Sequence, residues 1–153
     1  MSSAAIIDVQ LLDRPVTYSA GDVPDGAGGE CIFIGRTRAE SHQRHGRLLR
    51  LSYEVHRSLA ERTLRELAEV AVARWGCRNV CIHHAVGEVP VGSASVMIRV
   101  CCAHRAEAFE ACRFLIDELK RTAPIWKREE WESGTTWVNG QPVSAANDSA
   151  REA

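Results

Sequence analysis

Two residues are conspicuous among the basic positions of this chain, because they are lysines where every other positive charge is arginine. Lys120 and Lys127 are the only lysines among the 19 basic residues, and they flank the segment Pro-Ile-Trp. Arginine and lysine serve equally well as solvated charges. A lysine resists replacement where its amine has to lose a proton, attack a carbonyl or fit a narrow channel as a point charge. The two positions are therefore candidates for catalytic amines.

The positions of the two lysines allow both amines to reach one pocket. Lys120 lies in the last turn of a helix predicted at 105–123, and Lys127 lies in an extended segment at 125–131. Pro124 separates the two elements, because proline disfavours a helical conformation of the residue before it. A helix that ends and turns back into a strand can bring both side chains together. The alternative is that both lysines are surface charges at a helix end and at a strand edge.

A second candidate site lies at the start of the same helix, in the sequence CCAHR. No Ser, Thr, Asp or Asn stands at the N-cap, so the first backbone N–H groups lack a side-chain acceptor. Those amides, the positive end of the helix dipole and the side chains of His104 and Arg105 predict an anion site suited to phosphate. The alternative is a helix capped by water with a surface histidine and arginine.

The motif GRTR at the end of a predicted strand supplies two further basic residues. Gly35 allows the backbone to bend there. One of the two arginines could join the anion site, whereas a solvated charge is the default for either.

Thiols and histidines give weaker candidates for chemistry. Cys102 and His104 could act as a nucleophile and its base, but no third group that would orient the histidine is evident. The spacings of the six cysteines lack paired C-x-x-C motifs. His83 and His84 are adjacent on a predicted strand and face opposite ways, so they cannot share a metal ion without a bulge. We therefore predict no metal site.

The elements that must position these residues follow from the hydrophobic pattern. Apolar alternation and continuous apolar runs predict extended segments at residues 4–11, 30–38, 48–55, 79–87, 94–104 and 125–131. Helical spacing predicts helices at 56–76 and 105–123, with Gly76 as the C-cap of the first. The order of these elements favours one α+β domain in which helices pack on mixed or antiparallel strands.

The same pattern predicts which faces are buried. In the first helix, the expected core residues are Leu59, Thr63, Leu67, Val70 and Ala71. In the second helix, they are Phe109, Cys112, Leu115, Ile116 and Leu119. In the segment 48–55, one face is expected to carry Leu49, Leu51 and Tyr53. The stretches 19–29 and 39–47 are typical of loops, and 139–153 is low in large apolar residues and typical of a disordered tail.

Composition limits the classes of function. The formal net charge of −1 argues against a general nucleic-acid binder, which needs a broad basic face. No apolar run is long enough to span a membrane, and the first residues lack the pattern of a signal peptide. We therefore expect a cytoplasmic protein that binds neither nucleic acid nor membrane, and whose cysteines are reduced thiols.

Five motifs in this chain, GRTR, LSYEVH, VGEVPVG, CCAHRAEAFEACRFLIDELKRTAPIWKRE and GTTWV, resemble the large (catalytic) subunit of molybdopterin synthase in their order and spacing. The resemblance covers roughly residues 28 to 138. It implies a catalytic-subunit domain over residues 1–138, with an α/β hammerhead-type α+β fold and an additional small antiparallel sheet. The chain departs from the pattern at Ala85, where relatives usually carry arginine.

The resemblance also implies a reaction and its partners. Members of this family are sulfurtransferases that take sulfur from the C-terminal thiocarboxylate of a small ubiquitin-like subunit. They transfer it to cyclic pyranopterin monophosphate (precursor Z), which forms the dithiolene of molybdopterin in molybdenum cofactor biosynthesis. They form a homodimer that binds one small subunit at each end, giving a heterotetramer. The resemblance implies no metal and no other cofactor for the transfer itself.

Roles carry over from the resemblance residue by residue. Lys120 and Lys127 match the two pocket lysines of the family and are the predicted catalytic residues. Arg38 matches the arginine of its G-x-V-R motif. His104 and Arg105 match its H-R anion site, which would hold the substrate phosphate, either within one chain or across the dimer interface.

Two other functions are compatible with the residues. The domain could be a non-catalytic binding module or scaffold for a ubiquitin-like sulfur carrier, and the presence of both lysines favours the enzyme over this alternative. A thiol-dependent hydrolase that uses Cys102 is the third hypothesis, and it predicts sensitivity to alkylation.

Overall fold

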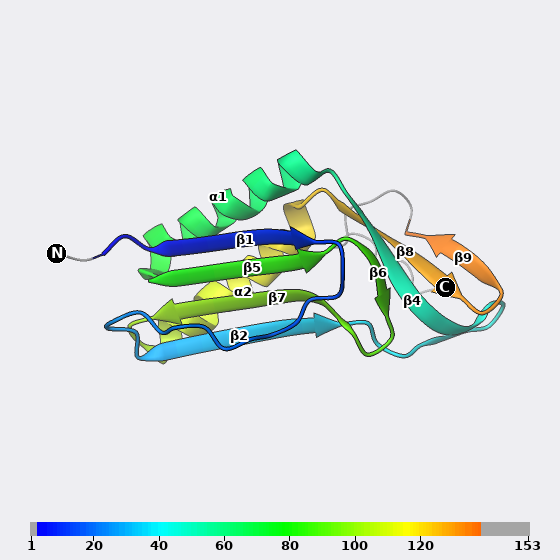
Figure 1. Ribbon diagram of the computed structural model, residues 1–153, viewed down its shortest axis with the longest axis horizontal. Coiled ribbons are helices and arrows are strands. Elements are labelled where there is room, and N and C mark those ends of the chain that lie inside the picture. Colours follow the sequence, from blue (N-terminus) through cyan, green and yellow to red (C-terminus); the bar gives the residue numbers. More distant parts are fainter. Residues whose placement is uncertain (1–2, 139–153) are drawn as a thin grey trace.

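The computed structural model describes residues 3–138, which form two β-sheets and two helices (Figure 1). The first sheet has four strands in the spatial order β1 (Ile6–Leu12), β5 (Asn79–Ala85), β7 (Ala94–Cys102) and β2 (Gly29–Arg36). Strands β1 and β5 are parallel, whereas β5 pairs with β7 and β7 with β2 in antiparallel fashion. The sheet is therefore mixed, which is one of the two arrangements that the sequence left open.

The second sheet is antiparallel and curls beside one end of the first (Figure 1). Its strands follow the order β3 (Ser41–His42), β4 (Gly46–Val55), β8 (Ile125–Trp131) and β9 (Gly134–Trp137), and β6 (Gly87–Pro90) also pairs with β4. This arrangement confirms the predicted α+β fold with an additional small antiparallel sheet.

Helices α1 (Arg57–Trp75) and α2 (Arg105–Thr122) pack on the mixed sheet, α1 against β1 and β5 and α2 against β2 and β7. The core between them includes Leu64, Ile98 and Leu115, which are fully buried. Helix α1 ends at Gly76, whose φ of 63° is the left-handed conformation expected of a glycine C-cap. Neither helix is long and apolar enough to cross a membrane.

The predicted core residues Ala71, Cys112, Leu115 and Leu119 are buried, but three large apolar residues lie outside the buried helix faces. Leu59 and Val70 of α1 are 37% and 46% exposed, and Phe109 of α2 is 64% exposed, so these three predictions are wrong. Small residues occupy the centre of both buried faces, namely Ala60, Ala68, Ala71, Ala108 and Ala111. Alanines let a helix approach the sheet closely, and the larger side chains next to them then lie at the margin of the contact.

Other differences occur in the curled sheet. A register shift between Leu48 and Arg50 interrupts the alternation of β4, so that Leu48 is buried and Leu49 is 42% exposed, contrary to the prediction. The expected loop 39–47 contains β3 and the start of β4, and the turn after β5 contains β6. The expected disordered tail, 139–153, lies outside the described residues.

Candidate active site

A pocket of about 120 Å³ lies where the mixed sheet meets the curled sheet. Its walls come from β2, β5 and β7 of the mixed sheet, from β4 and β8 of the curled sheet, and from the C-terminal part of α2. The polar side chains that line it include Arg36, Tyr53, His84, Lys120 and Lys127. No acidic side chain of the described residues lines it, so the pocket is suited to an anionic group.

Both lysines of the chain therefore line one pocket, and the turn between them explains why. Helix α2 stops at Ala123, which has the extended conformation (φ −70°, ψ 134°) expected of a residue before proline. The chain then reverses into β8, where Lys127 lies directly opposite Tyr53 of β4. Lys120 stays in the last turn of α2, and both lysines are partly buried.

His84 and Tyr53 form a buried aromatic pair in the pocket wall. Their rings meet edge to face with centroids 5.0 Å apart. The Nδ1 atom of His84 lies 2.7 Å from the carbonyl oxygen of Ala85. Because a carbonyl can only accept, Nδ1 carries the proton and Nε2 is left as an acceptor. Burial lowers the pKa of His84 to about 4, so this histidine is neutral at physiological pH.

Burial also raises the pKa of two titratable side chains on the strands that line the pocket, Glu129 of β8 and Tyr53 of β4. Glu129 follows Lys127 on β8 by two positions and is 8% exposed. Burial raises the pKa of this carboxyl group, against the opposing influence of the Lys127 charge. Burial likewise raises the pKa of the Tyr53 hydroxyl, which is neutral over the physiological range.

The two arginines of the GRTR motif have different surroundings. Arg36 lines the pocket, and its Nη1 donates a hydrogen bond to the carbonyl oxygen of Gly92 at 3.1 Å. Arg38 does not line the pocket. Its exposed side chain forms an ion pair of 2.8 Å with Glu40. The structure thus places Arg36, rather than Arg38, beside the lysines.

The predicted anion site lies at the other end of α2. His104 is the N-cap and makes no side-chain capping hydrogen bond, as the sequence predicted. His104 and Arg105 are both exposed. Lys120 comes 15 positions after Arg105 on the helix, which corresponds to roughly 22 Å along the helix axis. Within one chain, the structure therefore does not bring the anion site to the pocket.

The surroundings of Cys102 do not support its role as a nucleophile. Its side chain is fully buried, and its Sγ lies 3.2 Å from the Sγ of Cys77. Burial raises the pKa of the Cys102 thiol, which keeps it protonated and unreactive. The hypothesis of a hydrolase that uses this thiol has no geometric support.

Sequence reasoning missed Tyr53 and His84 as pocket residues, and it named Arg36 only as one of two arginines that could join an anion site. A signal for His84 was present, because it continues the alternation of Val80 and Ile82, whose side chains are fully buried in the core. Tyr53 was expected on a buried face, but nothing in the sequence indicated that this face borders a cavity.

Comparison with known proteins identifies the family. The sequence matches the family described as MoaE protein over residues 4–122. The molybdopterin synthase catalytic subunit of Pyrococcus abyssi is 35% identical over 137 residues, which cover 86% of this chain and 91% of that protein. The corresponding protein of Oryza sativa subsp. indica is 40% identical over 111 residues. The match covers 72% of this chain but only 56% of the rice protein, so the chain spans little more than half the length of that relative.

Solved structures agree with the sequence comparison. The structure of molybdopterin synthase from Staphylococcus aureus superposes with a TM-score of 0.76 at 27% identity, covering 83% of this chain and 93% of that one. A protein–protein complex of subunits 1 and 2 of molybdopterin-converting factor from Helicobacter pylori contains a chain of the same fold, with a TM-score of 0.69 at 18% identity and coverage of 86% and 90%. Sequence and fold together show that this chain belongs to the MoaE family, the family of molybdopterin synthase catalytic subunits.

Proposed function

We propose that this protein is the catalytic subunit of molybdopterin synthase. It transfers sulfur from the C-terminal thiocarboxylate of a small ubiquitin-like subunit to cyclic pyranopterin monophosphate, which forms the molybdopterin dithiolene. One observation carries the proposal: the only two lysines of the chain line the same pocket, and no acidic side chain of the described residues lines it with them. Such a pocket attracts a thiocarboxylate through its positive charge.

In the proposed reaction, the thiocarboxylate sulfur adds to an acceptor carbonyl carbon of the pterin side chain, whose C=O electrons move to the oxygen, which takes up a proton. Water then cleaves the acyl–sulfur bond, so that the sulfur stays on the substrate and the small subunit leaves with a C-terminal carboxylate. Lys120 lies nearest the thiocarboxylate, polarises its carbonyl group and stabilises the oxyanion that forms when the spent acyl group is hydrolysed. Lys127 contacts the pterin or the sulfur-bearing intermediate. His84 is neutral, so it offers a hydrogen-bond acceptor and adds no further positive charge to those of Lys120, Lys127 and Arg36.

The size of the pocket supports a site completed by a second chain. A volume of about 120 Å³ is small beside the roughly 300 to 1,000 Å³ of sites that enclose a whole small molecule. It suits the end of an extended tail and the reacting carbons of the substrate. We therefore propose that the substrate phosphate is held by His104 and Arg105 of the other protomer of a homodimer, because the same residues of one chain lie too far along α2. Arg38 is proposed to assist at the rim.

The proposed dimer gives a prediction for the isolated protein. Light scattering of the purified chain is expected to give about twice its mass of 16.9 kDa, because each pocket requires the anion site of a neighbouring protomer. Addition of the small subunit is expected to increase the mass by two small subunits for each dimer. A monomer at micromolar concentration would contradict a pocket shared between chains.

We propose a small ubiquitin-like protein as the second partner. The Helicobacter pylori complex joins two subunits of molybdopterin-converting factor, which supports a similar pairing for this chain. We further propose that residues 1–138 are the catalytic domain and that the protein works in the cytoplasm. The six cysteines are free thiols, in keeping with a reducing compartment.

Reconstitution tests the proposed function directly. The purified chain, a thiocarboxylated small subunit and cyclic pyranopterin monophosphate are incubated together, and dithiolene product is measured. Product formation at the expense of the thiocarboxylate is the expected result. Tight binding of the small subunit without any product would favour a non-catalytic scaffold. Product formation abolished by thiol alkylation in a chain that still binds both partners would favour the cysteine-dependent reaction.

The anion site gives a prediction about substrate affinity. Arg105→Ala is expected to weaken binding of cyclic pyranopterin monophosphate by roughly 10- to 100-fold, because a charge-assisted hydrogen bond to phosphate contributes about 1.5–3 kcal/mol. Binding of the small subunit is expected to change little. Calorimetry measures both affinities. Arg113→Ala is the matched control, since Arg113 lies on the same helix and its side chain is 85% exposed. Equal substrate affinity in both variants would remove Arg105 from the phosphate site.

A further inference from the structure

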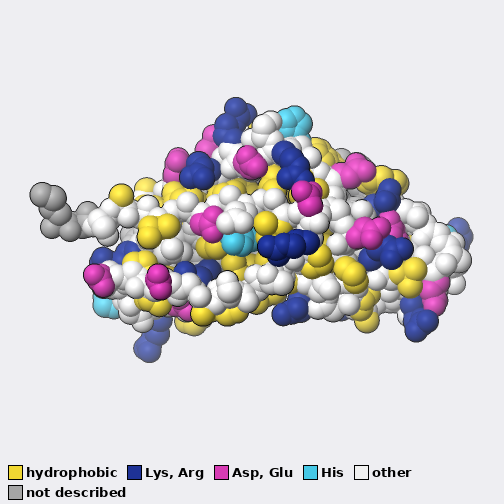
Figure 2. All heavy atoms as spheres, viewed as in Figure 1, with side chains coloured by type: hydrophobic (Ala, Val, Ile, Leu, Met, Phe, Trp, Pro, Cys, Tyr) yellow, Lys and Arg dark blue, Asp and Glu magenta, His cyan; other side chains and the backbone are white. Residues whose placement is uncertain are grey.

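A second group of chemically capable side chains lies on the opposite face of the mixed sheet from the pocket. Asp8 of β1 pairs with Cys81 of β5, and Cys81 and His83 project from the same face of β5 because they are two residues apart. His84 is the next residue of β5, so its side chain projects from the opposite face of the sheet and lines the pocket. Figure 2 shows the helix-free face, where acidic, basic and histidine side chains meet over the middle of the sheet.

The donor atoms of these three residues converge on one point. His83 Nε2 lies 2.8 Å from Asp8 Oδ2 and 3.2 Å from Cys81 Sγ, and the sulfur lies 3.7 Å from the same carboxylate oxygen. In a tetrahedral zinc site, bonds of about 2.0–2.3 Å place neighbouring ligand atoms about 3.3–3.6 Å apart. Shifts of roughly half an ångström would therefore convert this triangle into one face of a zinc tetrahedron.

The geometry argues against a catalytic triad of the same three residues. In a triad, the base uses one ring nitrogen for the nucleophile and the other for the carboxylate. Here, the thiol and the carboxylate both lie against the same atom, Nε2 of His83. Without a metal, His83 Nε2 donates to Asp8, and loss of that proton would turn the same atom towards an ion that the sulfur and the carboxylate also reach.

We propose that Asp8, Cys81 and His83 bind a zinc-type divalent metal ion, with its fourth position open to solvent. Sulfur, nitrogen and oxygen donors together are typical of zinc and related borderline metals and disfavour magnesium and calcium. Binding replaces the thiol proton of Cys81, which passes to solvent. It also replaces the proton that His83 Nε2 donates to Asp8, which passes to solvent or to Nδ1, so that the Nε2 lone pair becomes a ligand.

The surroundings support a metal ligand set. Gln10 Nε2 donates to both carboxylate oxygens of Asp8, at 3.0 Å to Oδ1 and 3.3 Å to Oδ2, which holds the carboxylate in place beside the other two donors. Cys81 and His83 are largely buried, with 8% of Cys81 and 16% of the His83 side chain exposed, whereas 43% of the Asp8 side chain is exposed. The site is thus held by buried strands and reached from solvent on the Asp8 side. An ion there would cross-link edge strand β1 to β5.

Metal titration tests the site in the whole chain. Zn²⁺ followed by calorimetry and Co²⁺ followed by absorbance are expected to bind with one ion per chain, and the Co²⁺ complex is expected to show a sulfur-to-metal charge-transfer band. Zn²⁺ is also expected to raise the Tm. Cys81→Ser is expected to abolish the charge-transfer band and to weaken Zn²⁺ binding by at least roughly 100-fold, since loss of even an outer contact costs 10- to 100-fold.

Two further variants keep the test decisive. Asp8→Asn changes a partly exposed side chain and is expected to weaken binding while the fold of the metal-free protein is retained. Cys31→Ser is the matched control, because Cys31 is a partly exposed thiol outside the cluster. Absence of stoichiometric binding in the wild type would overturn the proposal. Binding that survives Cys81→Ser and Asp8→Asn but is lost on replacing His42, which stacks on His45, would place the ion elsewhere and would also overturn it.

Discussion

Lys120→Arg is expected to lower the rate of sulfur transfer by roughly 100-fold or more, although it keeps the positive charge. The guanidinium is larger and planar, and it cannot release its proton at neutral pH. A proton carrier or a point donor in a pocket of about 120 Å³ cannot be replaced by such a group. Lys120 lies in the last turn of α2 and is not one of the buried residues of that helix, so folding and dimerisation are expected to stay close to those of the wild type.

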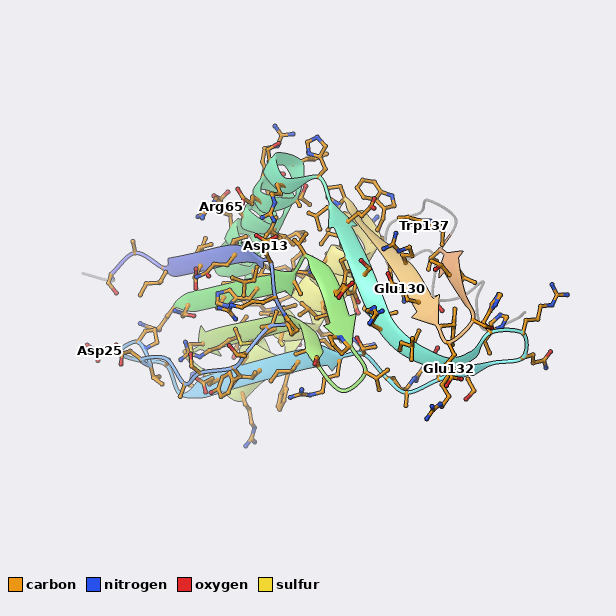
Figure 3. All side chains as sticks on the ribbon, turned by 45° about the vertical axis from the view of Figure 1, so that its right-hand side comes forward. Asp13, Asp25, Arg65, Glu130, Glu132 and Trp137 are labelled. Carbon is orange, nitrogen blue, oxygen red and sulfur yellow. The ribbon has the colours of Figure 1, made fainter. Side chains whose placement is uncertain are left out.

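Single-turnover product formation with saturating thiocarboxylated partner measures this effect. Arg65→Lys is the matched control, because Arg65 lies on α1 and points away from the sheet (Figure 3). Exchange of a solvated charge is expected to change the free energy of unfolding by well under about 1 kcal/mol and to leave turnover unchanged. Lys127→Arg is expected to reduce turnover less than Lys120→Arg, because its proposed role is electrostatic contact with substrate. Turnover near the wild-type rate in Lys120→Arg would mean that the position does not require an amine.

Much of this site could be predicted for two reasons. Its chemistry depends on residue types, and its position depends on residues that end a helix. The unusual lysines were visible from composition alone, and Pro124 fixed the end of the helix that carries Lys120. Gly76 likewise fixed the end of α1. The alternation of β5 placed His83 and His84 on opposite faces, and the structure agrees. These features depend on short-range backbone geometry, which a single sequence records well.

Features that depend on register could not be predicted. The pairing of β2 with β7 shifts between Gly35 and Arg36, and a Cβ atom at Gly35 would lie 2.7 Å from Val96 Cγ1. This irregularity brings Arg36 to the pocket and leaves Arg38 outside it, and residue types alone do not reveal it. The register shift between Leu48 and Arg50 in β4 is likewise a feature of strand pairing that residue types alone do not reveal. Contacts across strands, such as that between Asp8 and His83, also require knowledge of which strands are neighbours.

Periodicity misplaced three large apolar residues, Leu59, Val70 and Phe109, because it does not show which side chains lie closest to the sheet. Periodicity assigns the most hydrophobic side chains to the core, but a helix on a sheet buries the residues closest to the contact axis, whatever their size. In α1 and α2 these are mostly alanines, so Phe109 is left at the surface. An exposed phenylalanine beside the anion site is compatible with the proposed dimer, in which a second chain would cover this part of α2.

The stability of the protein is expected to fall by about 2 kcal/mol between pH 7 and pH 5 because of His84 alone. Burial lowers the pKa of His84 to about 4, whereas an unfolded histidine titrates near 6.5. Between these two values the unfolded chain binds a proton that the folded chain does not, so the free energy of unfolding decreases as the pH falls. The full contribution of His84, roughly 3 kcal/mol, is present above pH 6.5 and is lost as the pH falls to about 4.

Chemical denaturation of wild type and His84→Gln at a series of pH values measures this contribution. Glutamine can keep the hydrogen bond to the Ala85 carbonyl but cannot titrate. The variant is expected to be less stable at pH 7, and the difference between the two proteins should shrink or reverse by pH 5. Comparing the two proteins cancels the contributions of all other titrating groups. One of these is Glu129, whose pKa is raised by burial, so that its contribution to stability increases as the pH falls. A stability difference that stays constant from pH 7 to pH 5 would show that His84 accepts a proton as readily in the folded protein as in the unfolded chain.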